Sequence, residues 1–125
     1  MNTATKAPAL SVQLHHTARL LDRVMQGEST QTLLDQVPSS LRPGVQALLM
    51  TSLRHAALSR AACEHLLQKP PARPVVALLQ TALALMNAEP CPYAPHTLVN
   101  QTIEAAKSQR NTHHATGLIL SLIHI

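Results

Sequence analysis

The sequence predicts an all-α protein, a compact bundle of six or seven helices. Apolar residues make up 46% of the 125 residues and are mostly Leu, Ala and Val. Leu and Ala favour helices. Apolar side chains recur at intervals of three and four residues, and no segment alternates as a β-strand does. A chain of this length can form one domain with its own core.

The first predicted helix spans residues 11–26. Its apolar face consists of Leu14, Ala18, Leu21 and Met25. Gly27 is expected to end this helix, because glycine readily adopts the left-handed backbone found after helix C-termini. Ser29 is then placed to cap a short second helix over residues 30–37.

The middle of the chain predicts one long or kinked helix followed by a very apolar one. Helical spacing continues over residues 43–68, and the Lys-Pro-Pro sequence at 69–71 ends it. The next helix, residues 74–87, is apolar on nearly every side, which is typical of the buried centre of a bundle. Its main stripe is Val75, Leu78, Leu79, Ala82, Leu85 and Met86.

The last third begins with a connector at 89–95 that carries three prolines. A helix over 96–109, a short polar, His-rich loop and a new helical start at 115–119 follow. The final residues 120–125, LSLIHI, resemble the translation of a sequencing adapter. We therefore expect a flexible N-terminus at 1–10, one domain at 11–119 and a non-native tail at 120–125. A divergent native C-terminus is the alternative.

Three segments resemble, in their order and spacing, the NusB-type RNA-binding domain. The first is TARLL at 17–21, continuing through Gly27-Glu28-Ser29 to Leu33-Leu34. The second is LRPGVQAL at 41–48, ending in Leu53-Arg54. The third is the apolar helix, the Pro-rich turn and VNQTIEAAK at 99–107, followed by ATGLI at 115–119. The match covers Leu14 to Ile119 and is most similar to the N-terminal domain of bacterial rRNA cytosine methyltransferases of the RsmB (Sun/Fmu) kind.

The chain departs from the family pattern at three places. Met50, Thr51 and Ser52 stand where an aromatic residue and a glycine are usual, which weakens the prediction of tight helix packing there. Gln101 occupies a position that is usually acidic. After Gly-Leu-Ile the family continues with Asn, a small residue and a basic helix, and this chain does not.

The resemblance implies an RNA-binding domain whose partner is small-subunit rRNA. In the methyltransferases it precedes a Rossmann-like domain that uses S-adenosylmethionine to modify a cytosine. That domain would lie beyond residue 125, so we expect no cofactor and no catalytic residue in this chain. One alternative is a stand-alone transcription antitermination factor, which the weakly basic N-terminus disfavours because only Lys6 precedes Arg19. Another is a protein-interaction bundle without an RNA role.

Six basic residues are the candidates for RNA contacts: Arg19, Arg23, Arg54, Arg60, Lys107 and Arg110. The net charge of +4 and the pI of about 9.7 permit a polyanionic partner. Arg19 and Arg23 are four residues apart and share one helix face, with Asp22 expected to offset part of their charge. A solvated helix face is the alternative for this pair.

The other four candidates form two further groups. Arg54 and Arg60, with His55, make a possible second patch, although Arg54 could instead pair with Glu64 or cap a neighbouring helix end. Lys107 and Arg110 lie with His113 and His114 near the last loop. Favourable interaction with helix C-termini would also explain these cations.

Other chemistry finds little support in the sequence. The eight histidines include no pair three or four residues apart, so no helical metal chelate is expected. GxSxG, P-loop and GxGxxG motifs are absent from the sequence, and the six acids form no close pair. Cys63 and Cys91 are expected to be reduced thiols of a cytoplasmic protein. No apolar run reaches membrane-spanning length, and loss of a final helix is expected to cause self-association.

Overall fold

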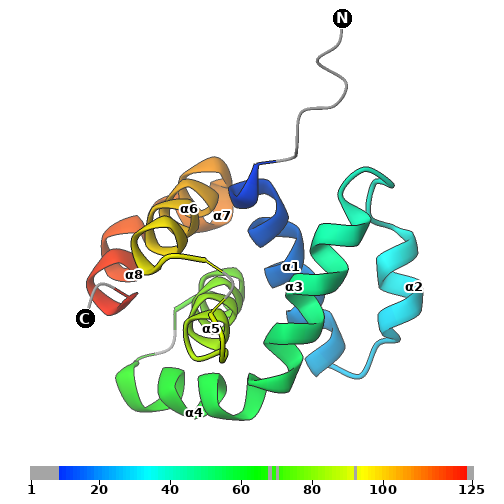
Figure 1. Ribbon diagram of the computed structural model, residues 1–125. Coiled ribbons are helices and arrows are strands. Elements are labelled where there is room, and N and C mark those ends of the chain that lie inside the picture. Colours follow the sequence, from blue (N-terminus) through cyan, green and yellow to red (C-terminus); the bar gives the residue numbers. More distant parts are fainter. Residues whose placement is uncertain (1–8, 68, 70, 92, 124–125) are drawn as a thin grey trace, which may run out of the picture.

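The computed structural model of the chain describes residues 9–67, 69, 71–91 and 93–123. These residues form eight helices and no strand, which confirms the all-α class (Figure 1). The helices are α1 (Leu10–Met25), α2 (Thr30–Asp35), α3 (Arg42–Arg54), α4 (Ala56–Leu66), α5 (Arg73–Met86), α6 (Pro95–Ser108), α7 (Arg110–His113) and α8 (Thr116–Ile123).

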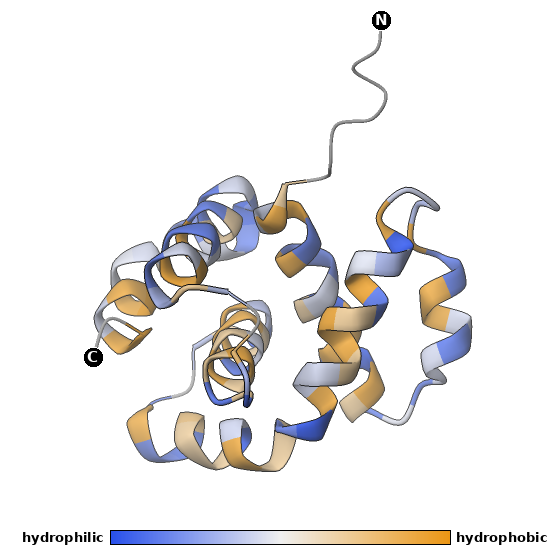
Figure 2. Ribbon diagram, in the orientation of Figure 1, coloured by the Kyte–Doolittle hydropathy of each residue, from blue (hydrophilic) through white to orange (hydrophobic). Residues whose placement is uncertain are grey.

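Helix α5 lies at the centre of the bundle, as its all-round apolar character predicted. It contacts α1, α3, α4, α6, α7 and α8, which surround it in Figure 1. Figure 2 shows apolar residues over most of α5 and on the inward faces of its neighbours. Its fully or almost fully buried residues include Val75, Leu79, Ala82 and Leu85. Burial of one such large aliphatic side chain stabilises the fold by roughly 1.5–3 kcal/mol.

The apolar side chains form two clusters. The larger one surrounds α5 and includes Leu14, Leu98 and Ile119. The smaller one joins α1, α2 and α3 and contains Leu20, Leu21, Leu33, Leu34, Val37, Val45 and Leu49. Helix α1 contributes Leu14 and Ala18 to the larger cluster and Leu20 and Leu21, further along the helix, to the smaller one. It therefore connects the α2 side of the molecule to the central core.

Helix α1 ends as the sequence predicted, through Gly27 at φ +101°. The Gly27 N–H donates to the Val24 carbonyl at 2.9 Å, and the Glu28 N–H donates to the Arg23 carbonyl at 3.1 Å. This pair of hydrogen bonds is the Schellman motif, in which the chain folds back over the last helical turn. The Ser29 hydroxyl then accepts from the Thr32 N–H at 3.5 Å, which confirms the predicted cap of α2.

The described residues form eight helices where six or seven were expected, and two features explain the difference. The long or kinked helix predicted over 43–68 is two helices, divided at His55, where φ is −111° and ψ is 12°. The break lets α3 pack on α1 while α4 turns to pack on α5, which one straight helix cannot do. The second feature is α7, a helix of 4 residues within the segment predicted to be a loop.

The C-terminal helix α8 packs on α5 and α6 and continues to Ile123. Ile119 and Ile123 are buried in the larger cluster, whereas Leu118 and Leu120 are 40% and 43% exposed. Residues 120–123 of the predicted tail thus belong to a packed helix. The rest of that tail, and residues 1–8 of the predicted N-terminal segment, lie outside the described residues.

Candidate nucleic-acid interface

The two arginines predicted to act together on α1 have different surroundings. The guanidinium of Arg23 donates to both carboxylate oxygens of Glu28, at 2.9 and 2.7 Å. This contact holds the pKa of Glu28 below its ordinary value. Arg19 is exposed and has no ion pair within the described part of the chain. Of this pair, only Arg19 presents an uncompensated charge.

The carboxylate of Asp22 does not pair with Arg19 or Arg23, so the prediction that it offsets part of their positive charge was wrong. This carboxylate accepts from Arg73 of α5 at 3.2 Å and from the Gln26 amide at 3.1 Å. Arg23 is instead neutralised by Glu28, because the turn at Gly27 folds Glu28 back toward the last turn of α1. The spacing of residues along α1 could not predict the pairing of Asp22 with Arg73, because Arg73 lies 51 residues further along the chain.

The second predicted patch is also divided. Arg60 Nε lies 3.7 Å from the Glu64 carboxylate, one turn further along α4. Arg54 lies in the last turn of α3, on the other side of the break at His55. The suggested pairing of Arg54 with Glu64 is therefore wrong, because Arg60 takes that position. Among the described residues Arg54 has no acidic partner.

The third group lies where α6 and α7 end. Lys107 is in the last turn of α6, and Arg110 and His113 belong to the single turn of α7. These positions are consistent with favourable cation interactions at helix C-termini, as the alternative explanation predicted. The described residues place no carboxylate in an ion pair with Lys107 or Arg110, so both charges are available at the surface.

A small cavity is lined by Arg19 of the first group and by no residue of the third group. It has a volume of about 100 Å³ and lies among α1, α5, α6 and α7. Polar side chains from two of these helices line it: His15, Arg19 and Asp22 from α1, and Asn111 and Thr112 from α7. Arg110 precedes Asn111 in α7 but does not itself line the cavity. We call it the α1–α7 cavity.

His15 and His16 are both held toward the neutral form at this junction. Burial lowers the pKa of His15 below its ordinary value of 6.5, and the nearby His16 and Arg19 lower it further. Burial and Arg19 also lower the pKa of His16. The two rings lie 5.4 Å apart in an edge-to-face arrangement, although they were expected on different faces. His16 Nδ1 is buried and has no hydrogen-bond partner among the described residues.

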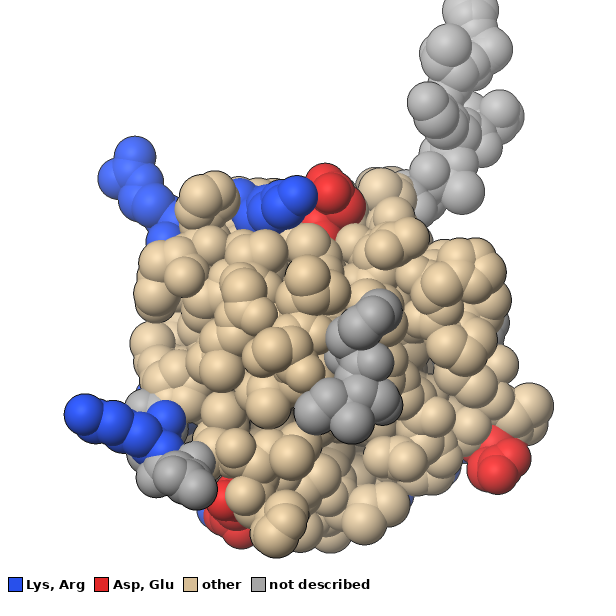
Figure 3. Space-filling model, turned by 90° about the vertical axis from the view of Figure 1, so that its left-hand side faces the viewer, with Lys and Arg blue, Asp and Glu red and all other residues tan. Residues whose placement is uncertain are grey.

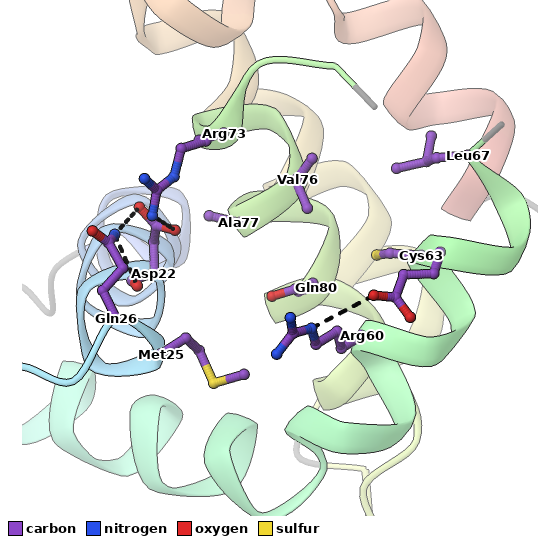
Figure 4. A pocket seen from close by; sticks show the side chains of 11 residues that line it. Asp22, Met25, Gln26, Arg60, Cys63, Leu67, Arg73, Val76, Ala77 and Gln80 are labelled. Atoms are coloured by element: carbon purple, nitrogen blue, oxygen red, sulfur yellow. Dashed lines mark hydrogen bonds and ion pairs between the residues drawn. The ribbon is translucent and has the colours of Figure 1, made fainter. Parts of the chain in front are cut away.

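A much larger groove, absent from the sequence-based prediction, lies between α1 and α4 with α5 as its floor (Figure 4). Its volume is about 570 Å³, within the range of small-molecule sites. Figure 4 shows Met25, Arg60 and Gln80 pointing toward one another across it. We call it the α1–α4 groove. Its lining from α5 is Arg73, Val76, Ala77 and Gln80, a stripe at helical spacing that the sequence does display.

The α1–α4 groove is electrically balanced. Its two arginines, Arg60 and Arg73, each lie beside a carboxylate, Glu64 and Asp22 respectively. Met25, Leu67 and Val76 make much of the remaining lining apolar. An anion entering this groove would meet both acids as well as both arginines. The groove is therefore a poorer site for a polyanion than the α1–α7 cavity.

The two cysteines are free, as predicted. Cys63 borders the α1–α4 groove but is 3% exposed. Burial, assisted by the charge of Glu64, raises the pKa of its thiol to about 11. The thiolate is the nucleophilic form, so Cys63 is not an activated nucleophile at neutral pH. Cys91 donates to the carbonyls of Leu85 and Tyr93, at 3.4 and 3.1 Å.

The side of the molecule at which α8 lies carries few charges. Figure 3 shows charged side chains at the margins of this face and uncharged residues over its centre. The described residues contain no cluster of three or more His, Cys, Asp or Glu side chains arranged to hold a metal. None of the helices in the described ranges is both long and apolar enough to cross a membrane.

Comparisons with known proteins gave no relative. No family model, no curated protein and no solved structure matches this chain.

Proposed function

We propose that this chain is an RNA-binding helical module without a catalytic site. In a longer protein it would position small-subunit rRNA for an S-adenosylmethionine-dependent cytosine methyltransferase domain, as the resemblance to the NusB-type domain implies. The proposed contact surface is the junction of α1, α6 and α7. Its cations are Arg19, Lys107 and Arg110.

The observation that carries the proposal is the lack of acidic partners at this junction. Among the described residues, Arg19, Lys107 and Arg110 form no ion pair, whereas Arg23, Arg60 and Arg73 each do. Phosphate contacts require exposed positive charge at a suitable spacing, and an arginine fork can hold a phosphate with two hydrogen bonds. Arg19, Lys107 and Arg110 can therefore offer uncompensated positive charge to a phosphate, whereas the three paired arginines cannot.

The proposed binding is electrostatic rather than base-specific. Tyr93 is the one aromatic residue of the sequence, so stacking platforms for unpaired bases are not expected. Three phosphate contacts would give a log–log dependence of affinity on salt with a slope of roughly −2 to −3. A slope of this size is the expected signature of the junction.

Filter binding of the full chain to small-subunit rRNA transcribed in vitro tests the proposal. Arg19→Glu, combined with Lys107→Glu, should abolish the salt-dependent binding, because it reverses charge at two of the three contacts. A control is the double variant Arg23→Gln and Glu28→Gln, which removes a whole ion pair and leaves the net charge unchanged. Affinity that does not vary with salt, or that survives the double reversal, would reject RNA binding as the function.

A protein-interaction module is the second candidate, and two observations favour it. The face at α8 is largely uncharged, and the α1–α4 groove is balanced in charge and partly apolar. Such surfaces suit a protein segment better than an RNA backbone. Under this alternative Met25→Asp, at the groove, would abolish partner binding, while the double reversal at the α1–α6–α7 junction would not.

A further inference from the structure

The α1–α7 cavity combines a free cation with two further groups that can donate hydrogen bonds. Arg19 and Asn111 are exposed and have no hydrogen-bond partner among the described residues. His15 lies one helical turn before Arg19 and lines the same cavity. The Thr112 hydroxyl already donates to the Ala106 carbonyl at 2.8 Å, which fixes α7 against α6. The cavity therefore has free hydrogen-bond donors, Arg19 and Asn111, on helices that are held in place.

Its size restricts what can enter. A cavity of roughly 150 Å³ accommodates a benzene ring. At about 100 Å³, the α1–α7 cavity is too small for a nucleobase with its ribose. It is large enough for about three water molecules at their liquid volume, or for one tetrahedral anion in their place.

The one acid that lines the cavity lies away from His15. Asp22 is seven residues from His15, which corresponds to about 10 Å along a helix. Its carboxylate is held by Arg73 and by the Gln26 amide. Asp22 is only three residues from Arg19, so what limits its repulsion of an anion is compensation of its charge by Arg73 rather than distance. An anion beside His15 and Arg19 thus meets a carboxylate whose charge is compensated by Arg73.

No other titratable group faces His15 across the cavity. The lining from α5 is Pro74, Ala77 and Leu78, and that from α6 is Ala105. Asn111 and Thr112 from α7 do not titrate near neutral pH. On α1 itself, the groups that act on His15 are His16 and Arg19. An anion would therefore be the dominant new influence on the His15 ring.

We propose that the α1–α7 cavity binds a single phosphate group of RNA, with Arg19 and Asn111 as donors and with His15 protonated when the phosphate is bound. This inference rests on RNA binding as the proposed function and specifies how one phosphate is held. No covalent bond changes: His15 takes its proton from solvent, and the phosphodiester keeps its single negative charge. RNA binding is therefore coupled to the uptake of one proton at this site.

Histidine ring signals in proton NMR test the site directly. The full chain is titrated with acid alone, with inorganic phosphate and with small-subunit rRNA, while sodium chloride of equal ionic strength serves as the control. The phosphate and the RNA are each expected to raise the pH midpoint of His15 by about one pH unit, because an opposite charge favours the charged ring. An unchanged midpoint in both titrations would overturn the proposal.

Filter binding at about pH 5.5 and about pH 8 provides the second measurement, because an unperturbed histidine changes charge between them. The full chain is expected to bind rRNA about tenfold more tightly at the lower pH, the effect of one charge-assisted hydrogen bond. His15→Gln should remove most of this difference. His65→Gln, an exposed histidine on α4, is the matched control and should preserve it.

The two measurements separate failure of the site from failure of the function. If rRNA binds in a salt-dependent manner but His15→Gln retains the pH dependence, RNA binding stands and the phosphate site is rejected. If rRNA does not bind but inorganic phosphate raises the His15 midpoint, the cavity is a site for free phosphate and the proposed RNA function is rejected.

Discussion

The α1–α7 cavity and the α1–α4 groove both border α1 and α5, but their arginines differ in their surroundings. In the groove, Arg60 and Arg73 each lie beside a carboxylate. At the cavity, Arg19 forms no ion pair among the described residues. Asp22 and Ala77 line both sites, so the two share a wall.

The comparison teaches that net charge is a poor guide to the charge that a partner can meet. The sequence has 10 Lys and Arg residues against 6 Asp and Glu residues, and composition alone cannot say which cations are compensated. Exposed ion pairs contribute only about 0–1 kcal/mol to stability. Their larger consequence here is to lower the positive potential of the groove relative to that of the cavity.

The largest expected effect comes from the buried core of α5, the helix that both sites border. Leu79 is 1% exposed in the centre of α5, and Leu79→Ala should lower the free energy of unfolding by about 2–5 kcal/mol, through lost burial and the cavity left behind. Urea unfolding followed by circular dichroism measures this. Leu58→Ala on α4, at a side chain that is 58% exposed, is the control and should change stability by less than about 0.5 kcal/mol. Equal losses for the two variants would contradict α5 as the central helix.

The second largest effect is on RNA binding, and it compares an unpaired arginine at the cavity with a paired arginine in the groove. Arg19→Gln should weaken rRNA binding by about fivefold to tenfold, because it removes one unpaired cation, and should make the salt slope shallower by about one. Arg60→Gln removes a cation that is compensated by Glu64, so a change below about twofold is expected. Filter binding over a series of salt concentrations measures both quantities. A larger loss for Arg60→Gln would place the RNA in the groove instead.

Much of the fold follows from local sequence signals. The helical spacing of apolar residues predicted α1, α2, α5 and α6, and the continuous apolar character of α5 predicted its central position. Gly27 and Ser29 predicted the end of one helix and the start of the next. These features depend on neighbours within a few residues, which is why they can be found without a structure.

The candidate site was predicted less well, because it depends on contacts between distant segments. The ion pair between Asp22 and Arg73 joins residues 51 positions apart, and no local pattern indicates it. The break at His55 likewise follows from the different partners of α3 and α4. The pairing of Arg23 with Glu28 was within reach, because a helix that stops at Gly27 brings the next residue back over its last turn.

The third prediction tests whether pairing is what removes Arg23 from the RNA surface. Glu28→Gln should free the Arg23 guanidinium and strengthen rRNA binding by about twofold to fivefold, with a salt slope steeper by about one. Glu64→Gln frees Arg60 in the groove and is the matched control, for which we expect no gain. Filter binding compares the two variants. If Glu64→Gln gave the larger gain in affinity, the RNA would contact the α1–α4 groove rather than the surface near Arg23.

The smallest expected effect is a dependence of stability on pH. His15 and His16 have pKa values below 6.5 in the folded chain, so the folded state binds protons less readily than the unfolded state does. Their contribution to stability is complete above pH 6.5 and is lost as the pH falls below it. The depressed pKa of Glu28 acts only below its ordinary value of 4.5, so the two effects are separated.

Thermal melts between about pH 7.5 and about pH 5 measure this effect, since histidine charge changes in that interval. The melting temperature should fall toward the acid end, and His15→Gln should reduce the fall. A melting temperature that rises on acidification would mean that the folded state holds these protons more tightly than the unfolded chain, the opposite of what burial of the rings implies.

The shared position of Asp22 has a consequence for cooperativity. A ligand in the groove that drew Arg73 away would leave a bare carboxylate at the edge of the phosphate site, and we expect it to weaken RNA affinity. Thermodynamic linkage requires the converse as well, so that bound RNA would weaken the groove ligand by the same factor. A single aspartate would then make two neighbouring surfaces antagonists, with no movement of the helices needed.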